Sequence, residues 1–114
     1  MAIRNNITKD DEWFQHEAKS IVIPVVDNVG ANVDLTGHEL EWSLRKFSGS
    51  VTVYLNKVTP NITISNHIVT IPIANTDYAN FSHGIYFHDL WDKTDNALLS
   101  YGDAHLRPAR NPHA

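Results

Sequence analysis

Residues 33–46 read Val33-Asp34-Leu35-Thr36-Gly37-His38-Glu39-Leu40-Glu41-Trp42-Ser43-Leu44-Arg45-Lys46. The first part predicts a turn, because Asp and Thr side chains bond to the local backbone and Gly accepts a positive φ. The second part alternates strictly, with Leu40, Trp42 and Leu44 on one face and polar or charged residues on the other. A period of two predicts a β-strand with one buried face and one solvated face.

The rest of the chain predicts further short strands, separated by turn signals about every eight to twelve residues. With residues 39–47, we expect about seven strands, a pattern typical of an antiparallel sandwich of the immunoglobulin-like kind. The other predicted strands are 17–26, 51–56, 62–64, 68–73, 83–90 and 97–106. Residues 75–82 predict one helical turn that crosses between the sheets. We expect Trp42 in the inter-sheet core, with neighbours among Leu40, Leu44, Val53, Ile71 and Tyr86.

Size and charge narrow the class of protein. The 114 residues suffice for one domain, which we divide into an N-terminal arm (1–16), a β-sandwich (17–108) and a C-terminal tail (109–114). The absence of cysteine excludes disulfides and thiolate metal sites. A net charge of −4 without a basic stripe argues against nucleic-acid binding. The apolar runs are too short to span a bilayer, so no membrane partner is expected.

Histidines and aspartates invite a metal hypothesis, because the chain holds seven histidines. His83 and His88 are five residues apart, which places them on opposite faces of a strand. His88 and His105 could meet across strands near Asp103, but a metal site needs three or four convergent ligands. Asp92, Asp95 and Asp103 suggest a calcium loop, yet the sixth position counted from Asp92, which requires glycine, is Ala97. We therefore expect no metal site and no cofactor.

The chain shows no arrangement that specifies a reaction. Glu39 and Glu41 share a strand face at about the carboxylate separation of a retaining glycosidase. A solvated strand face beside Arg45 explains the pair equally simply. The chain lacks a nucleophile elbow and a phosphate-binding glycine loop, so we expect no catalytic residue and no enzyme.

The N-terminal arm is polar yet carries large apolar side chains. Thr8 and Asp11 predict a cap on a single helical turn. One of the adjacent rings of Trp13 and Phe14 could anchor in a neighbouring subunit, or the arm could fold back onto its own sandwich. The basic tail could pair with the acidic run at residues 10–12 of another copy. The predicted subunit contacts are Ile3, Ile7, Trp13, Phe14, Arg107 and Arg110, so a truncation starting at Glu17 should fold but fail to assemble.

Four segments together resemble small bacteriophage virion proteins of the tail and baseplate type, similar in style to the N-terminal domain of baseplate upper proteins. They cover about residues 17–108 in the expected order. The segments are the turn Asp27-Asn28-Val29-Gly30-Ala31-Asn32, the turn Val33-Asp34-Leu35-Thr36-Gly37, the crossover from Asn75-Thr76-Asp77 to Gly84-Ile85-Tyr86-Phe87-His88-Asp89-Leu90, and the closing strand Ala97-Leu98-Leu99-Ser100-Tyr101-Gly102 with Pro108.

The resemblance implies a non-enzymatic structural subunit, present in several copies in the virion and made in the host cytoplasm. Its expected partners are other virion proteins of the tail, baseplate or neck. A head–tail connector or a capsid decoration protein is the alternative within this class. Outside it, a carbohydrate-binding or adhesin module would need exposed aromatics on one platform, for which Tyr54, Tyr101 and Trp91 are the candidates.

Overall fold

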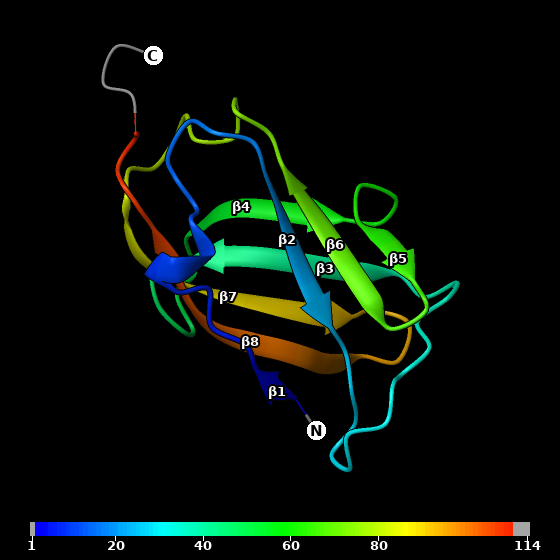
Figure 1. Cartoon of the computed structure of the whole chain (residues 1–114). Coiled ribbons are helices and arrows are strands. Elements are labelled where there is room, and N and C mark those ends of the chain that lie inside the picture. The colour runs from blue at the N-terminus through cyan, green and yellow to red at the C-terminus, as the bar shows by residue number, and fades with distance from the viewer. Residues whose placement is uncertain (1, 111–114) are drawn as a thin grey trace.

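The computed structural model describes residues 2–110, which form two facing β-sheets (Figure 1). The strands are β1 (Ile3–Arg4), β2 (Lys19–Pro24), β3 (Leu40–Arg45), β4 (Val53–Val58), β5 (Thr63–Ser65), β6 (Ile68–Ile73), β7 (Gly84–Asp92) and β8 (Ala97–Leu106). One sheet has the order β1-β8-β7-β3-β4 and the other β2-β6-β5. All pairs are antiparallel except β1 with β8. The expected all-β, immunoglobulin-like sandwich is confirmed.

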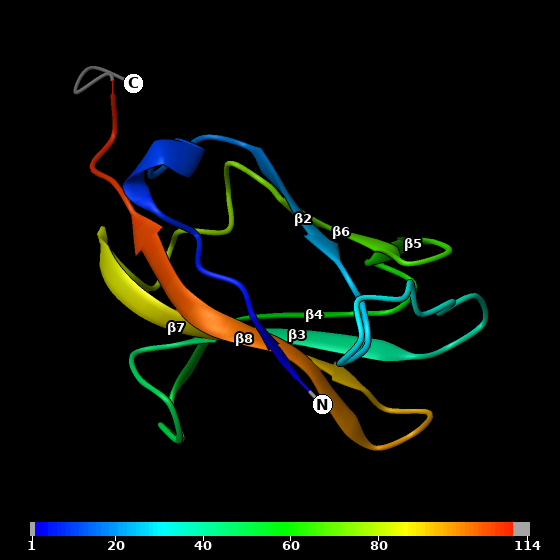
Figure 2. The same ribbon diagram turned by 60° about the horizontal axis from the view of Figure 1, so that its bottom comes forward.

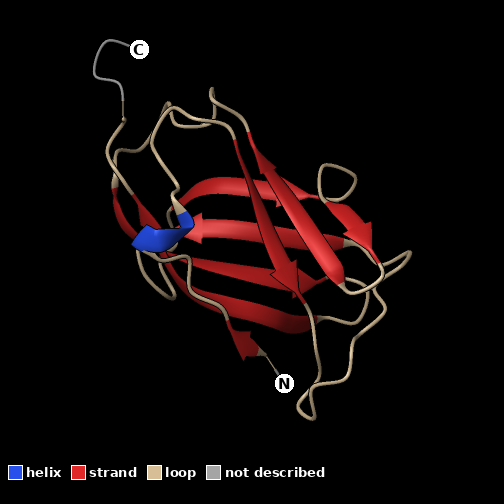
Figure 3. Ribbon diagram, in the orientation of Figure 1, coloured by secondary structure: helices blue, strands red, loops and turns tan. Residues whose placement is uncertain are grey.

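A single-turn 3-10 helix, η1 (Lys9–Asp11), is the helical element of residues 2–110 (Figure 3). The side chain of Thr8 accepts from Asp10 N, and the Asp11 carboxylate accepts from Thr8 N at 2.6 Å. The predicted cap is therefore confirmed. The helical turn expected at residues 75–82 is wrong, because this crossover consists of hydrogen-bonded turns, including Asp77 N to Ala74 O.

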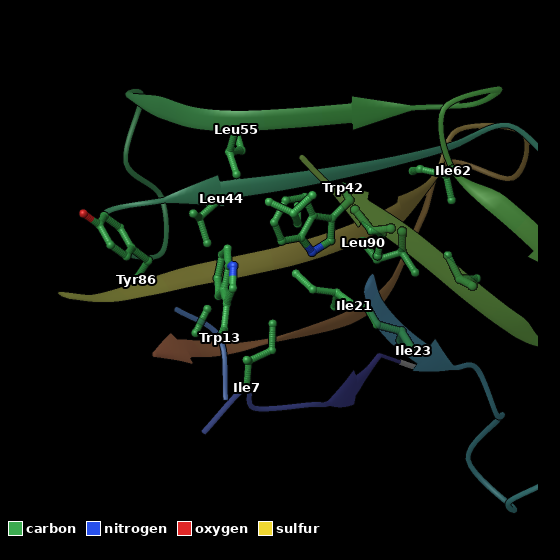
Figure 4. Close-up of a cluster of buried hydrophobic side chains, with 14 of the residues drawn as sticks. Ile7, Trp13, Ile21, Ile23, Trp42, Leu44, Leu55, Ile62, Tyr86 and Leu90 are labelled. Atoms are coloured by element: carbon green, nitrogen blue, oxygen red, sulfur yellow. The ribbon is translucent and has the colours of Figure 1, made fainter. Parts of the chain in front are cut away.

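The core lies between the sheets and follows the alternation of the strands (Figure 4). Leu40, Trp42 and Leu44 of β3 are fully buried. They pair with Asp92, Leu90 and His88 of β7 in register. From the opposite sheet, β2 and β6 contribute a second layer of isoleucine and valine: Ile21, Ile23, Val69, Ile71 and Ile73. The predicted position of Trp42 is thus correct.

One predicted core residue is wrong. Val53 is 40% exposed, whereas Leu55 is buried and pairs with Leu44. A bulge between Leu44 and Arg45 shifts the register at the start of β4. Because a shifted register changes which side chains reach the core, Val53 points outward and Tyr54 packs against the core instead.

The N-terminal segment forms part of the sandwich. After β1, isolated bridges join Ile7 to Ala104 and Phe14 to Arg107, so residues 3–14 run along β8 (Figure 2). Gly102 permits this close approach, since a Cβ atom there would lie 2.4 Å from the carbonyl oxygen of Asn5. The boundary that we placed after residue 16 therefore does not separate an arm from the body of the sandwich. The tail predicted at 109–114 lies outside the described residues, apart from 109 and 110.

Candidate functional site

Two connections meet at one end of the sandwich and bring three titratable side chains together. The first is the segment between β2 and β3, where Asp34 Oδ1 accepts hydrogen bonds from the backbone and hydroxyl of Thr36. The second is the β7–β8 hairpin, where Asp92 Oδ1 accepts from the backbone of Thr94 and Asp95. These local turns orient His38 and Asp92 toward each other.

His38, Asp92 and Asp95 form this cluster, which we call the loop cluster. His38 Nδ1 lies 2.7 Å from Asp92 Oδ2 and 3.8 Å from Asp95 Oδ2. The side chain of Asp92 is 2% exposed, whereas that of Asp95 is 65% exposed. One nitrogen and two carboxylate oxygens lie within 4.8 Å of one another, so they could share a divalent cation.

The electrostatics of the loop cluster favour a charged imidazole. The hydrogen bond to Asp92 raises the pKa of His38, and the carboxylates of Asp92, Asp95 and Asp34 act in the same direction. The protonated ring donates to a buried carboxylate, which stabilises the contact between the two connections. A cation would have to displace this proton. Within the described residues, no observation beyond the donor set points to a metal, and a loop-to-loop ion pair accounts for the geometry.

His38 was not among the predicted site residues. Asp92, Asp95 and Asp103 suggested a calcium loop, but His38 lies 54 residues from Asp92 in the chain. Register supplies the missing signal, because Leu40 at the start of β3 pairs with Asp92 at the end of β7. The residue two positions before Leu40 then reaches the same end of the sheet.

His88 occupies the core beneath the N-terminal segment. Trp42 Nε1 donates to His88 Nδ1 at 3.1 Å, so the ring hydrogen lies on Nε2 and donates to the carbonyl of Asn5 at 2.6 Å. Burial lowers the pKa of His88 and keeps the ring neutral. His105 lies on the opposite face of the sheet, since it pairs with outward-facing Ile85. The structure therefore does not bring His88 and His105 together.

Ile7 and Trp13, predicted as subunit contacts, belong to the core of their own chain. Trp13 is fully buried and Ile7 is 7% exposed. Trp13 Nε1 donates to the hydroxyl of Tyr78 at 2.8 Å, and that hydroxyl donates to Glu17 O at 2.6 Å. The hypothesis that this ring anchors in a neighbour is wrong for this structure, because the ring is fully buried in the core of its own chain and hydrogen-bonded to Tyr78.

Phe14, Arg107 and Arg110 form a second contact within the chain. The two guanidinium groups lie 4.7 and 4.2 Å from the centre of the Phe14 ring. Arg110 also forms a bidentate ion pair with Glu17, with Nε 2.8 Å from Oε2. The ion pair of Arg110 is thus formed with Glu17 of its own chain, and not with the acidic run at residues 10–12 that we had considered. Ile3 is half-buried on β1 beside β8.

The outward face of the five-stranded sheet carries a shallow hollow of about 320 Å³. Glu41, Arg45 and Trp91 line it, and Trp91 is 39% exposed. Tyr101 lies on the same face, where it pairs with Asp89. Tyr54 does not join this surface, because its ring packs against Phe81 and Tyr86 with centroids 5.7 and 5.4 Å apart.

The β3–β4 loop (residues 46–52) exposes large apolar side chains. Phe47 is 62% exposed and Val51 is 95% exposed, and Val53 follows at the start of β4. Exposed apolar side chains that form one contiguous patch often mark a contact with another molecule, and these three side chains come from one loop and the first residue of the next strand. The loop therefore takes the role that we had expected of the N-terminal arm as the candidate contact surface.

The similarity of the chain to known proteins is slight. No family model and no curated protein matches the chain. A solved structure described as the NK cell receptor Nkp44, a triggering partner in natural cytotoxicity, is similar to it at 7% identity and a TM-score of 0.47. The match covers 96% of this chain and 99% of that one. Across residues 2–110, no helix is long and apolar enough to cross a membrane. At this identity and TM-score the likeness carries no conclusion about this chain.

Proposed function

We propose that this protein is a non-enzymatic structural subunit of a phage particle, in the tail or baseplate, which acts by contact with other virion proteins. The exposed β3–β4 loop carries the contact part of the proposal, since Phe47 and Val51 have no role in the core of their own chain. The phage part is supported by the four resembling segments of the sequence. Two of these segments are turns fixed by Asp27 and Asp34 side chains.

The sandwich suits a contact role because the exposed side chains of the loop, Phe47 and Val51, lie outside the core cluster. The core between the sheets is closed from within by the N-terminal segment. Contacts on a symmetric particle are repeated in many copies, so a weak apolar contact suffices through effective concentration. A contact surface as small as the β3–β4 loop is therefore sufficient.

Purified particles of the phage that encodes this protein provide the test. Mass spectrometry should find the chain in the particles, and immunogold labelling should place it on the tail or baseplate. A Phe47→Ser, Val51→Ser double variant should remain folded but be lost from complemented particles, whereas a Val29→Ser control, at an exposed valine outside the loop, should be incorporated. Label on the neck or head would instead favour the connector or decoration role, and absence from particles would contradict the proposal.

A carbohydrate-binding or adhesin module is the second candidate, and the hollow around Trp91 favours it. An exposed indole beside Glu41 and Arg45 combines an apolar platform with polar groups, as sugar sites do. Quenching or shift of tryptophan fluorescence on titration with cell-wall glycans tests it. The response should vanish in Trp91→Ala and persist in Phe47→Ser.

A further inference from the structure

Ser43 of β3 and Asp89 of β7 lie opposite each other at the hollow on the outward face of the five-stranded sheet. Ser43 lines the hollow and is 3% exposed. Burial is the main cause that raises the pKa of the Asp89 carboxyl. Arg45 and Trp91 lower that pKa, and the carboxylate of Glu41 raises it. These three neighbours all line the hollow, so the Asp89 carboxyl lies among its walls.

One acceptor at the hollow lacks a partner. Asp89 Oδ1 is buried, yet it accepts no hydrogen bond from residues 2–110. Buried polar atoms are nearly always hydrogen-bonded, so such an acceptor requires an explanation. Trp91, two residues along the strand, is 39% exposed, and side chains at a binding surface commonly change rotamer when a ligand arrives. A ligand that lies on Trp91 can therefore bring a donor to Asp89 Oδ1.

Other polar groups of the hollow are held in place by hydrogen bonds. Asn56 Nδ2 donates to Glu41 Oε2 at 2.8 Å and to Ser43 Oγ at 3.2 Å. Arg45 Nη1 donates to Ser50 O at 2.8 Å, which anchors the guanidinium group. These bonds do not use Glu41 Oε1, the hydroxyl hydrogen of Ser43 or the other N–H groups of Arg45. The hollow thus offers both donors and acceptors at fixed positions.

The charges around the hollow determine which class of ligand fits. A phosphate or a carboxylate would lie close to the carboxylates of Glu41 and Asp89. An amine would lie close to Arg45 and Lys93, which also line the hollow. Like charges repel in both cases, whereas a hydroxyl group is uncharged and both donates and accepts. An uncharged ring with several hydroxyl groups and one apolar face therefore matches the polar groups and the exposed indole.

We propose that the hollow binds an uncharged saccharide whose apolar ring face lies on Trp91 and whose hydroxyl groups donate to Asp89 and Glu41. Arg45 and Ser43 donate to the oxygens of the same hydroxyl groups. The inference rests on the carbohydrate-binding candidate given above, and it adds the class of sugar and the residues that select it. It holds or fails independently of the role of the β3–β4 loop in a phage particle.

NMR titration of the wild-type chain tests the class of sugar. The uncharged probes are glucose, galactose, mannose, N-acetylglucosamine and their short oligomers, and the charged counterparts are glucuronic acid, galacturonic acid and glucosamine. With an uncharged probe, the indole N–H signal of Trp91 should shift to saturation, while those of buried Trp13 and Trp42 stay in place. A Trp91 shift with charged sugars alone would overturn the inference and leave the carbohydrate-binding candidate standing. No shift with any probe would overturn both.

Asp89→Asn and Asp103→Asn form a matched pair of variants. Asp103 lies on β8 on the same face of the sheet, where its side chain is 59% exposed and pairs with Arg4 instead of lining the hollow. Asp89→Asn should weaken binding of the uncharged probe by about tenfold or more, since hydrogen bonds to a charged group are strong, and Asp103→Asn should not change it. Glu41→Gln carries the same expectation as Asp89→Asn, should that variant fail to fold. Unchanged affinity in both hollow variants, or equal loss in Asp103→Asn, would overturn the proposal.

Discussion

Replacing Trp13 with alanine should lower the free energy of unfolding by about 3–5 kcal/mol, as for other fully buried tryptophans. The indole has no exposed surface, and its Nε1 donates to Tyr78. The loss would remove a large part of the roughly 5–15 kcal/mol that stabilises a domain of this kind. At about 4 °C or more per kcal/mol, the melting temperature should fall by roughly 10–20 °C.

Urea denaturation followed by far-ultraviolet circular dichroism measures this effect, with Trp91→Ala as the matched control. Trp91 is 39% exposed on the outward face of the sheet, so its removal should cost no more than about 1 kcal/mol. Both variants should be measured at two protein concentrations tenfold apart. A side chain buried within its own chain gives the same loss at both concentrations.

The result decides between the two roles considered for the N-terminal segment. If Trp13→Ala unfolded within 1 kcal/mol of the wild type, roughly the effect of a surface substitution, the ring would not be part of the core. A loss that grows with protein concentration would place the ring in a neighbouring subunit. Either result would refute the closed sandwich described above.

Three further predictions concern the N-terminal segment and the two histidines. A truncation starting at Glu17 should not fold, because it removes Trp13 and the Asn5 carbonyl that accepts from His88. The sequence alone had predicted that the truncated chain folds. A cooperative melt of the truncated chain would contradict the present prediction. By NMR titration, His38 should show a raised pKa that falls toward 6.5 in Asp92→Asn. The contribution of protonated His38 to the free energy of unfolding is then fully present below about pH 6.5 and is lost as the pH rises through the folded-state pKa. An unchanged His38 pKa in Asp92→Asn would exclude the contact between His38 and Asp92. His88 should titrate below 6.5, since burial lowers its pKa. The fold therefore favours the neutral ring, and the free energy of unfolding should fall as the pH drops below about 6.5. A His88 ring that titrates at or above 6.5 would contradict its burial.

Local sequence pattern was sufficient for the elements whose structure depends on neighbours in the chain. The alternation of Leu40, Trp42 and Leu44 predicted a strand and its buried face, because side chains on a strand alternate with a fixed period of two. The turn at Asp34 and the cap at Thr8 depend on hydrogen bonds to residues two or three positions away. The residue types that form such local bonds can be recognised in the sequence.

Features that depend on distant residues were decided only by the tertiary structure. The sequence indicated that the Trp13 ring should be buried. Burial within the same chain and burial against another copy would remove the ring from water equally well. The burial of Trp13 among core residues of its own chain, together with a glycine at 102 that lets residue 5 approach, settled the choice. The pairing of His38 with Asp92 and the outward position of Val53 likewise follow from strand register and a bulge. Register depends on the simultaneous packing of both sheets, and no local segment of this chain carries that information.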